Sequence, residues 1–335
     1  MVDLWRSCRE RYVTPRALSP LQALTASTEQ TFACMKAAYD SGINFFDCAE
    51  GYAGGESERV MGAAIKKYGW KRNDLVISTK INWGAANGDN PVNNGGLSRK
   101  HLVEGTNAAL ERLGLDYVDL IYAHRPDRNT PMEETVRGFN WLIEQGKAFY
   151  WGTSEWRADE IERAWAIAHR LNLIGPVMEQ PEYNLLKRTK VEDEFRLLYE
   201  VHGLGLTIFS PLKQGILSGK YNDAIPDESR LGKSDDPWAQ GMREKFGSDD
   251  WIAEVKQIKS LEPIAKKLDT SLAGLAMAWV LKNPRISSAI TGASRPEQIY
   301  DSVRSLAVLP KLTTEIMDEI DALLKNKPEE FTRRF

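Results

Sequence analysis

Short apolar runs alternate with amphipathic helical segments along most of this chain. The stretch from Glu29 to Tyr39 has a helical period, is closed by Ser41 and Gly42, and is followed by a run of β-branched and aromatic residues. Repeated alternation of this kind is typical of a parallel sheet whose strands are joined by helices. The strand candidates are Ile43–Phe46, Leu75–Thr79, Val118–Ala123, Ala148–Gly152, Val177–Glu179, Leu206–Phe209 and Ala289–Thr291. These seven runs predict an α/β fold, a (β/α)8 TIM barrel that is one strand short.

The first strand of such a barrel should precede Glu29, yet residues 1–28 show no strand pattern and contain Pro15 and Pro20. We therefore expect an atypical segment over residues 1–28, a barrel over residues 29–328 and a tail over residues 329–335. Two alternatives stay open for the first strand. Residues 1–28 replace it in an unusual way, or the start of the chain is truncated or wrongly predicted, which would leave two unpaired sheet edges.

The composition excludes several classes of protein. The chain has 335 residues, is 42% hydrophobic and carries a formal net charge of -3, without a basic stripe that would bind nucleic acid. Its longest apolar stretch, Leu272–Leu281, is too short to span a membrane, and charges near the N-terminus interrupt any secretory signal. The three cysteines show no paired spacing. We expect a cytoplasmic protein with no metal site.

Two long insertions interrupt the alternation, Asn82–Leu97 and Leu212–Leu261. Loops at the C-terminal face of a barrel shape pockets and cover cofactors. The first insertion is rich in Gly and Asn and has Trp83 at its start, so we expect an ordered but irregular loop. The second holds prolines and many charges, and we expect a cover that moves.

Three of the predicted strands run directly into a titratable residue. They lead to Asp47, Lys80 and His124, and Tyr52 follows a few residues after Asp47. Strand ends converge on one face of a barrel, so these four side chains should meet there. Each residue alone has an ordinary structural explanation, as a turn residue, a half-buried aromatic, a solvated strand end or a core histidine. Together they form a set that can protonate a carbonyl oxygen.

The roles follow from the chemistry of each group. Tyrosine has an ordinary pKa near 10, and an ammonium about 4 Å away favours its phenolate by about 4 kcal/mol. We therefore expect Lys80 to lower the pKa of Tyr52, and we expect burial of the phenol to make this decrease smaller. Asp47 would keep Lys80 charged, and His124 would hydrogen-bond the carbonyl oxygen. The remaining histidines lack partners at metal-ligand spacing, so we assign no chemistry to His101, His169 and His202.

Several strings extend this pattern across residues 29 to 328. The segment INFFDCAEGYAGGESERVMG is similar to the part of aldo-keto reductases that supplies a catalytic aspartate and tyrosine. Further strings resemble one branch of that family in particular, the potassium-channel β subunits. They are LVISTKINWG, GLSRKHLVEG, LERLGLDYVDLIYAHRPD, TPMEETVRGF, YWGTSEWRADEI, FSPLKQGILSGKY and LPKL. The resemblance implies that Asp47, Tyr52, Lys80 and His124 are a catalytic tetrad with Tyr52 as general acid. Mammalian channel β subunits carry asparagine where this chain has His124, which favours catalysis here.

The resemblance also implies an NADP(H) site. It assigns Asp47, Ser154 and Gln180 to the nicotinamide end and stacks Phe209 under the ring, where that branch has tryptophan; phenylalanine keeps a π-face with less area. The phosphate-binding and ribose-binding positions that it implies are Ser210, Pro211, Leu212, Gln214, Lys220, Arg230, Gly292, Ser294 and Gln298. These positions favour NADPH over NADH.

The residues after the last predicted strand point to phosphate binding without help from the resemblance. Thr291 to Ser294 follow that strand and Pro296 begins a helix, a junction that can direct backbone N–H groups at a phosphate, although it is also a common loop. There is no G-x-G-x-x-G motif to support a Rossmann fold.

Three hypotheses for function follow. The first is an NADPH-dependent reductase of a small aldehyde or ketone. The second is an NADP(H)-binding regulatory β subunit of a potassium channel, with a membrane channel as its partner. The third is a catalytically dead product of a damaged reading frame, motivated by residues 1–28. The resembled branch often forms homo-tetramers, so a homo-tetramer is a further expectation.

Overall fold

The computed structural model describes residues 16–18, 28–84, 92–233 and 237–329. The chain divides into two compact units. The first unit comprises Met1–Glu182, Glu194–Phe209 and Arg285–Pro296, and the second comprises Tyr183–Asp193, Ser210–Pro284 and Glu297–Phe335.

The first unit is a closed barrel of parallel strands in sequence order. Each strand pairs with its neighbours along the chain, and the last strand pairs with the first. Within the described residues the strands are β1 (Arg16–Leu18), β2 (Phe45–Asp47), β3 (Val76–Ile81), β4 (Val118–Ala123), β5 (Ala148–Ser154), β6 (Met178–Gln180), β7 (Gly205–Ile208) and β8 (Ile286–Thr291). The predicted (β/α)8 barrel is confirmed.

Strand β1 lies inside the segment for which we predicted no strand. Ala17 pairs with Phe45 of β2 and also with Ile290 of β8, so three residues close the barrel. The expectation of a missing strand was therefore wrong, because residues within the segment 1–28 supply it. A strand this short carries no period of its own, and its conformation depends on the two neighbours that pair with it.

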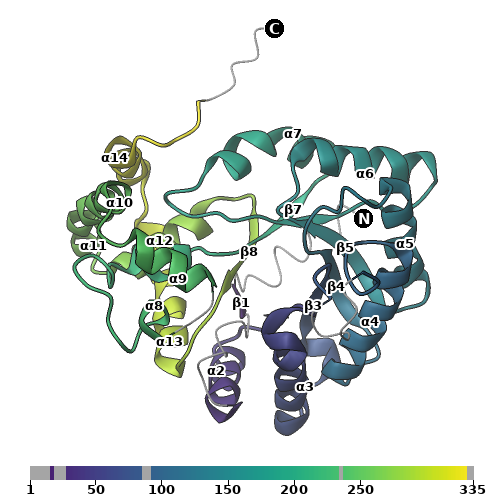
Figure 1. Cartoon of the computed structure of the whole chain (residues 1–335). Coiled ribbons are helices and arrows are strands. Elements are labelled where there is room, and N and C mark those ends of the chain that lie inside the picture. The colour runs from purple at the N-terminus through teal and green to yellow at the C-terminus, as the bar shows by residue number, and fades with distance from the viewer. Residues whose placement is uncertain (1–15, 19–27, 85–91, 234–236, 330–335) are drawn as a thin grey trace, which may run out of the picture. The chain divides into compact units, whose positions relative to one another are not determined.

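Helices connect the strands and pack side by side around them (Figure 1). In the first unit they are α2 (Thr28–Asp40), α3 (Glu56–Tyr68), α4 (Arg99–Leu113), α5 (Met132–Glu144), α6 (Ala158–Arg170) and α7 (Arg196–Val201). Ser98 caps α4 by accepting a hydrogen bond from the amide of His101, and Gly114 ends the helix with φ of 64°. A serine N-cap and a left-handed glycine at the C-terminal end are common helix boundaries.

An apolar layer fills part of the barrel interior. Its buried side chains come from every second strand, β2, β4, β6 and β8, as in other barrels of this type. The members are Phe45, Leu120, Tyr122, Met178 and Ile290, with Val76, Tyr150 and Val177 packed against them. This layer supports the polar side chains at the strand ends.

The second unit is helical in its described part. Its elements are η5 (Lys213–Ser218), α8 (Arg230–Lys233), α9 (Pro237–Lys245), α10 (Asp249–Ser260), α11 (Glu262–Lys267), α12 (Leu272–Lys282), η6 (Ser305–Lys311) and α14 (Thr314–Leu324), and α13 (Pro296–Arg304) begins at the boundary. The apolar stretch Leu272–Leu281 is part of α12, and the residues from Gly274 to Val280 are buried. The insertion Leu212–Leu261 holds several helices, so it is more regular than its composition indicated.

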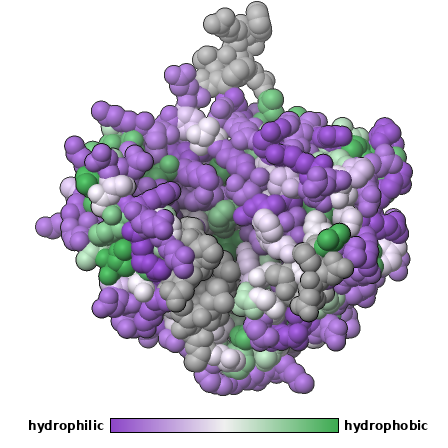
Figure 2. Space-filling view, viewed as in Figure 1, coloured by the Kyte–Doolittle hydropathy of each residue, from purple (hydrophilic) through white to green (hydrophobic). Residues whose placement is uncertain are grey.

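The surface is mainly hydrophilic in the view of Figure 2, and hydrophobic residues form small separate groups there. Scattered groups of this kind are ordinary for a folded chain. Among the helices of the described ranges, none combines the length and the apolar character needed to cross a bilayer.

Close contact between α3 and α4 depends on Gly62. A Cβ added at Gly62 would lie 2.0 Å from the carbonyl oxygen of Leu113, so one helix would have to shift. We expect Gly62→Ala to lower the free energy of unfolding by about 1–3 kcal/mol, as overpacking does. Urea denaturation measures the change. Gly241 in α9 is the matched control: a Cβ there meets nothing, so Gly241→Ala should stabilise the chain by up to about 1 kcal/mol. Equal effects of the two variants would contradict this account.

Candidate active site

The four predicted catalytic residues lie together in the first unit. Residues two apart in a strand face the same side, so the register that puts Phe45 inside the barrel also directs Asp47 inward. The same spacing relates Tyr122 to His124 at the end of β4. The polar residues thus form the layer beyond the apolar one, at the carboxyl ends of the strands, where barrel enzymes carry their active sites.

A buried ion pair forms the centre of this layer. The Nζ atom of Lys80 lies 2.5 Å from Oδ2 of Asp47, and both side chains are almost fully buried. Lys80 also donates to the carbonyl oxygen of Cys48 at 2.8 Å. The other carboxylate oxygen of Asp47 accepts from Ser78 Oγ at 2.5 Å and from Gln180 Nε2 at 3.3 Å. Burial disfavours the ammonium, but Asp47 and Tyr52 outweigh it and raise the pKa of Lys80.

Tyr52 lies within hydrogen-bond reach of the ion pair. Lys80 Nζ donates to Tyr52 Oη at 3.2 Å and lies 4.8 Å from the centre of the phenol ring. Burial raises the pKa of Tyr52, and the opposing charge of Lys80 does not cancel it. Our expectation that Lys80 would lower the pKa of Tyr52 was wrong in its net direction, because desolvation of the phenolate is the larger effect. Tyr52 therefore keeps its proton at neutral pH.

His124 completes the set. Its ring centre lies 5.6 Å from that of Tyr52, edge to face, and its side chain is buried. Burial lowers the pKa of His124, and the charges of Lys80 and Arg125 lower it further, so the imidazole is neutral at neutral pH. No described group hydrogen-bonds its Nδ1 atom.

Two residues near His124 were not assigned a role from the sequence. Trp83 lies edge-on to His124, with ring centres 6.2 Å apart, and 57% of it is exposed. Arg125 donates to Ser154 Oγ at 3.1 Å and to the carbonyl oxygen of His124 at 2.5 Å. Trp83 lies three residues after Lys80 and Arg125 directly follows His124, and this closeness in sequence could have indicated that both lie near the site.

Some of the predicted cofactor residues adjoin the tetrad within the first unit. Ser154 ends β5 and donates to the carbonyl oxygen of Gln180 at 2.9 Å, and Gln180 in turn reaches Asp47. Phe209 follows β7, is half-buried, and donates its amide to the carbonyl oxygen of Pro181 at 3.0 Å. Gly292 and Ser294 follow β8 and precede α13, which begins at Pro296 as predicted.

The other predicted cofactor residues belong to the second unit. Ser210, Lys213 and Gln214 have φ of 53°, 45° and 55°, in the left-handed region that non-glycine residues rarely adopt. Lys220 reaches back toward this turn, because its Nζ would lie 3.0 Å from a Cβ added at Gly215. Pro211 and Leu212 lie within the same turn, Arg230 begins α8, and Gln298 lies in α13.

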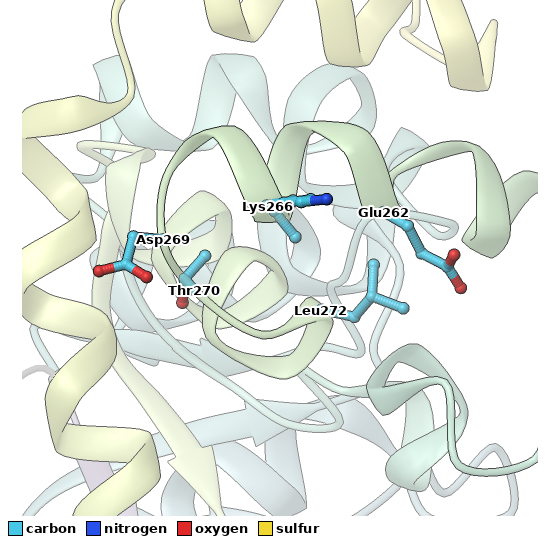
Figure 3. Close-up of a pocket in the computed structure, with 6 residues that line it drawn as sticks. Glu262, Lys266, Asp269, Thr270 and Leu272 are labelled. Atoms are coloured by element: carbon cyan, nitrogen blue, oxygen red, sulfur yellow. The ribbon is translucent and has the colours of Figure 1, made fainter.

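A shallow cavity of about 340 Å³ lies elsewhere in the second unit (Figure 3). Its walls come from α11 and from the turn that leads into α12. Glu262 and Asp269 lie at opposite ends of the row of labelled side chains in Figure 3. None of the residues that line this cavity is among the predicted site residues, and it carries no catalytic interpretation.

Comparison with known proteins agrees with this geometry. Residues 21–325 match the Aldo/keto reductase family, so the chain belongs to that family. It is 50% identical over 298 residues to a protein of Oryza sativa subsp. japonica named "Probable voltage-gated potassium channel subunit beta", covering 89% of this chain and 88% of the relative. A protein of the same name from Arabidopsis thaliana is 51% identical over 291 residues, 87% of this chain and 86% of the relative.

The ion pair makes a prediction about stability that does not depend on activity. Asp47→Asn leaves the ammonium of Lys80 buried without its counter-charge, which costs about 3–5 kcal/mol. We expect the double variant Asp47→Asn with Lys80→Met to lose less, since no buried charge remains. Urea denaturation of the parent and the two variants measures the difference. A double variant less stable than Asp47→Asn alone would contradict the pairing.

Proposed function

We propose that this chain reduces aldehydes or ketones with NADPH and that Tyr52 protonates the carbonyl oxygen. The observation that carries the proposal is the hydrogen-bonded series from Asp47 through Lys80 to Tyr52, beside a neutral His124. Membership of the Aldo/keto reductase family supports an oxidoreductase.

Each member has one task in this mechanism. Tyr52 gives its proton to the carbonyl oxygen and becomes a phenolate, which the nearby ammonium of Lys80 stabilises. Asp47 keeps Lys80 charged and fixed in place. Neutral His124 can donate one N–H to the same carbonyl oxygen and hold the substrate in line. NADPH, when bound, would supply the hydride to the carbonyl carbon. Proton uptake from water restores Tyr52 after each turnover.

The residues present fit such a cofactor. Gln180 has its amide next to Asp47, and Ser154, hydrogen-bonded to Gln180, adds a hydroxyl; a carboxamide needs groups of these two kinds. In the second unit the left-handed turn at Ser210 to Gly215 is held despite its conformational cost, and such strain accompanies ligand clamps. The cation of Lys220 next to that turn suits a phosphate. The preference for NADPH over NADH stays a proposal that rests on the resemblance around Arg230, Ser294 and Gln298.

Replacing the proton donor tests the reaction directly. We expect Tyr52→Phe to lower turnover of a reactive aromatic aldehyde by about 10²–10⁴-fold, the usual contribution of a general acid. NADPH affinity should stay within about twofold of the parent, because the phenol hydroxyl is not needed to bind the cofactor. A single turnover followed through NADPH absorbance, with a separate fluorescence titration of NADPH, measures both. Tyr300→Phe, an exposed tyrosine, is the control. Unchanged turnover in Tyr52→Phe would contradict the assignment.

The pKa shifts predict how turnover depends on pH. The pKa of Tyr52 is raised above its ordinary value, so the phenol keeps its proton as the pH rises through neutral. The pKa of His124 is lowered below its ordinary value, so the imidazole stays neutral as the pH falls through about 6.5. We expect kcat for reduction to stay level between about pH 6 and pH 9 and to fall only above this range, where Tyr52 ionises. A midpoint near pH 6.5 or near pH 8 in the kcat profile would contradict these protonation states.

A second function is favoured by the comparisons. Relatives about half identical to this chain carry the name of potassium channel β subunits. We propose as the alternative that this chain binds NADP(H) and associates, as a cytoplasmic homo-tetramer, with a membrane channel. Affinity purification of the tagged chain from detergent-solubilised membranes, followed by mass spectrometry, tests it. Recovery of a potassium channel with the native chain but not with heat-denatured chain supports the alternative, and its absence counts against it.

A further inference from the structure

We infer that Glu50 and His101 form a positioning pair that fixes Trp83 beside His124 and so governs how tightly a carbonyl substrate binds. This inference rests on the proposed reductase function. Glu50 lies between Asp47 and Tyr52 in the sequence, and His101 lies in the first turn of α4, outside the strands.

Three contacts of this pair meet at one carboxylate oxygen. Oε1 of Glu50 accepts from the amide of Asn82 at 2.7 Å, from the amide of Gly84 at 3.0 Å, and lies 3.1 Å from Nε2 of His101. Glu50 and His101 are 0% and 1% exposed. Burial would raise the pKa of Glu50, but the bonds from His101 and the two amides outweigh it and lower the pKa, so the carboxylate is ionised at neutral pH.

The two amides held by Glu50 belong to the residues on either side of Trp83. Anchoring both neighbours fixes the backbone of Trp83, and the amide of Glu50 itself donates to the carbonyl oxygen of Lys80 at 3.2 Å. Gly84 has φ of 62°, and a Cβ there would lie 1.2 Å from the carbonyl oxygen of Asn94, so the loop is closely packed on its other side as well. Trp83 thus has little freedom of backbone position.

The indole of Trp83 is placed where a substrate would meet it. Its ring is edge-on to His124, the residue proposed to hold the carbonyl oxygen, and more than half of it is exposed. An aromatic side chain held in place loses little conformational entropy when a flat ligand stacks on it. Glu50 and His101 touch none of the reacting groups, so their effect should appear in substrate binding and not in proton transfer.

His101 connects the carboxylate of Glu50 to helix α4. Its amide is held by Ser98 at 3.3 Å, which orients the first turn of α4 and directs the imidazole at Glu50. A buried carboxylate that lost this partner would hold the loop less firmly. Sequence spacing alone gave no reason to pair the two residues, which are 51 positions apart.

A double-mutant cycle tests the inference in the full chain. Trp83→Ala should raise KM for an aromatic aldehyde by about tenfold, the loss of one good aromatic contact, with little change in kcat. Glu50→Ala should raise KM by a similar factor, and the double variant by no more than either single one, since both remove the same contact. Glu50→Gln keeps an oxygen acceptor and should restore KM to within about threefold of the parent.

His202→Gln is the matched control. His202 is also a buried histidine paired with a glutamate, at 2.7 Å from Glu162, but it contacts neither Trp83 nor His124 in the described residues. It should change stability without changing KM. Additive KM effects of Glu50→Ala and Trp83→Ala, or an equal KM effect of His202→Gln, would overturn the inference.

Amide hydrogen exchange separates this inference from the proposed function. Exchange at Asn82 and Gly84 should accelerate in Glu50→Ala and in His101→Gln but not in His202→Gln, whether or not the chain is an enzyme. Unchanged exchange would overturn the positioning pair. A parent chain that turns over no aldehyde while exchange responds as expected would contradict the proposed function and the effect on substrate binding, and would leave only the pairing of Glu50 and His101 with the loop.

Discussion

The buried ion pair of Asp47 and Lys80 is the interaction on which the rest of the site depends. An ammonium removed from water is costly unless its charge is paired and its donors are satisfied. Here Asp47 supplies the charge and the carbonyl of Cys48 a second acceptor, while Gln180 supports the carboxylate from β6. These bonds form only when the ends of several strands meet in one register. The geometry of the site therefore depends on the closure of the barrel.

Two further buried carboxylates, outside the barrel interior, are also paired with hydrogen-bond donors. Glu58 in α3 accepts from Thr79 Oγ1 of β3 at 2.5 Å and from Arg112 Nε of α4 at 2.7 Å. Glu50 links the loop after β2 to His101 of α4. Each carboxylate therefore joins a strand or its following loop to surrounding helices. Hydrogen-bonded pairs of this kind require a specific geometry, and they restrict the movement of the strands and loops that carry the site residues.

Features that depend on neighbouring residues could be predicted from the sequence, whereas features that depend on contacts between distant residues could not. Local patterns predicted β4 with its observed bounds, and the strand ends predicted that Asp47, Tyr52, Lys80 and His124 lie together. Strand β1 was missed because three residues carry no period and pairing with β2 and β8 determines them. The pair of Glu50 and His101 was missed because it joins distant residues. The direction of the pKa shift at Tyr52 required the balance between burial and the charge of Lys80, which spacing does not contain.

The protonation states of Tyr52 and His124 agree with the proposed direction of the reaction. A site that oxidises alcohols needs a phenolate to accept a proton, and a raised pKa at Tyr52 leaves little phenolate at neutral pH. A neutral His124 can donate one hydrogen bond without adding a second positive charge next to Lys80. Tyr52 is therefore in the protonated form that the proposed carbonyl reduction would use. These protonation states arise from burial and from the charges of the ion pair, all within the first unit.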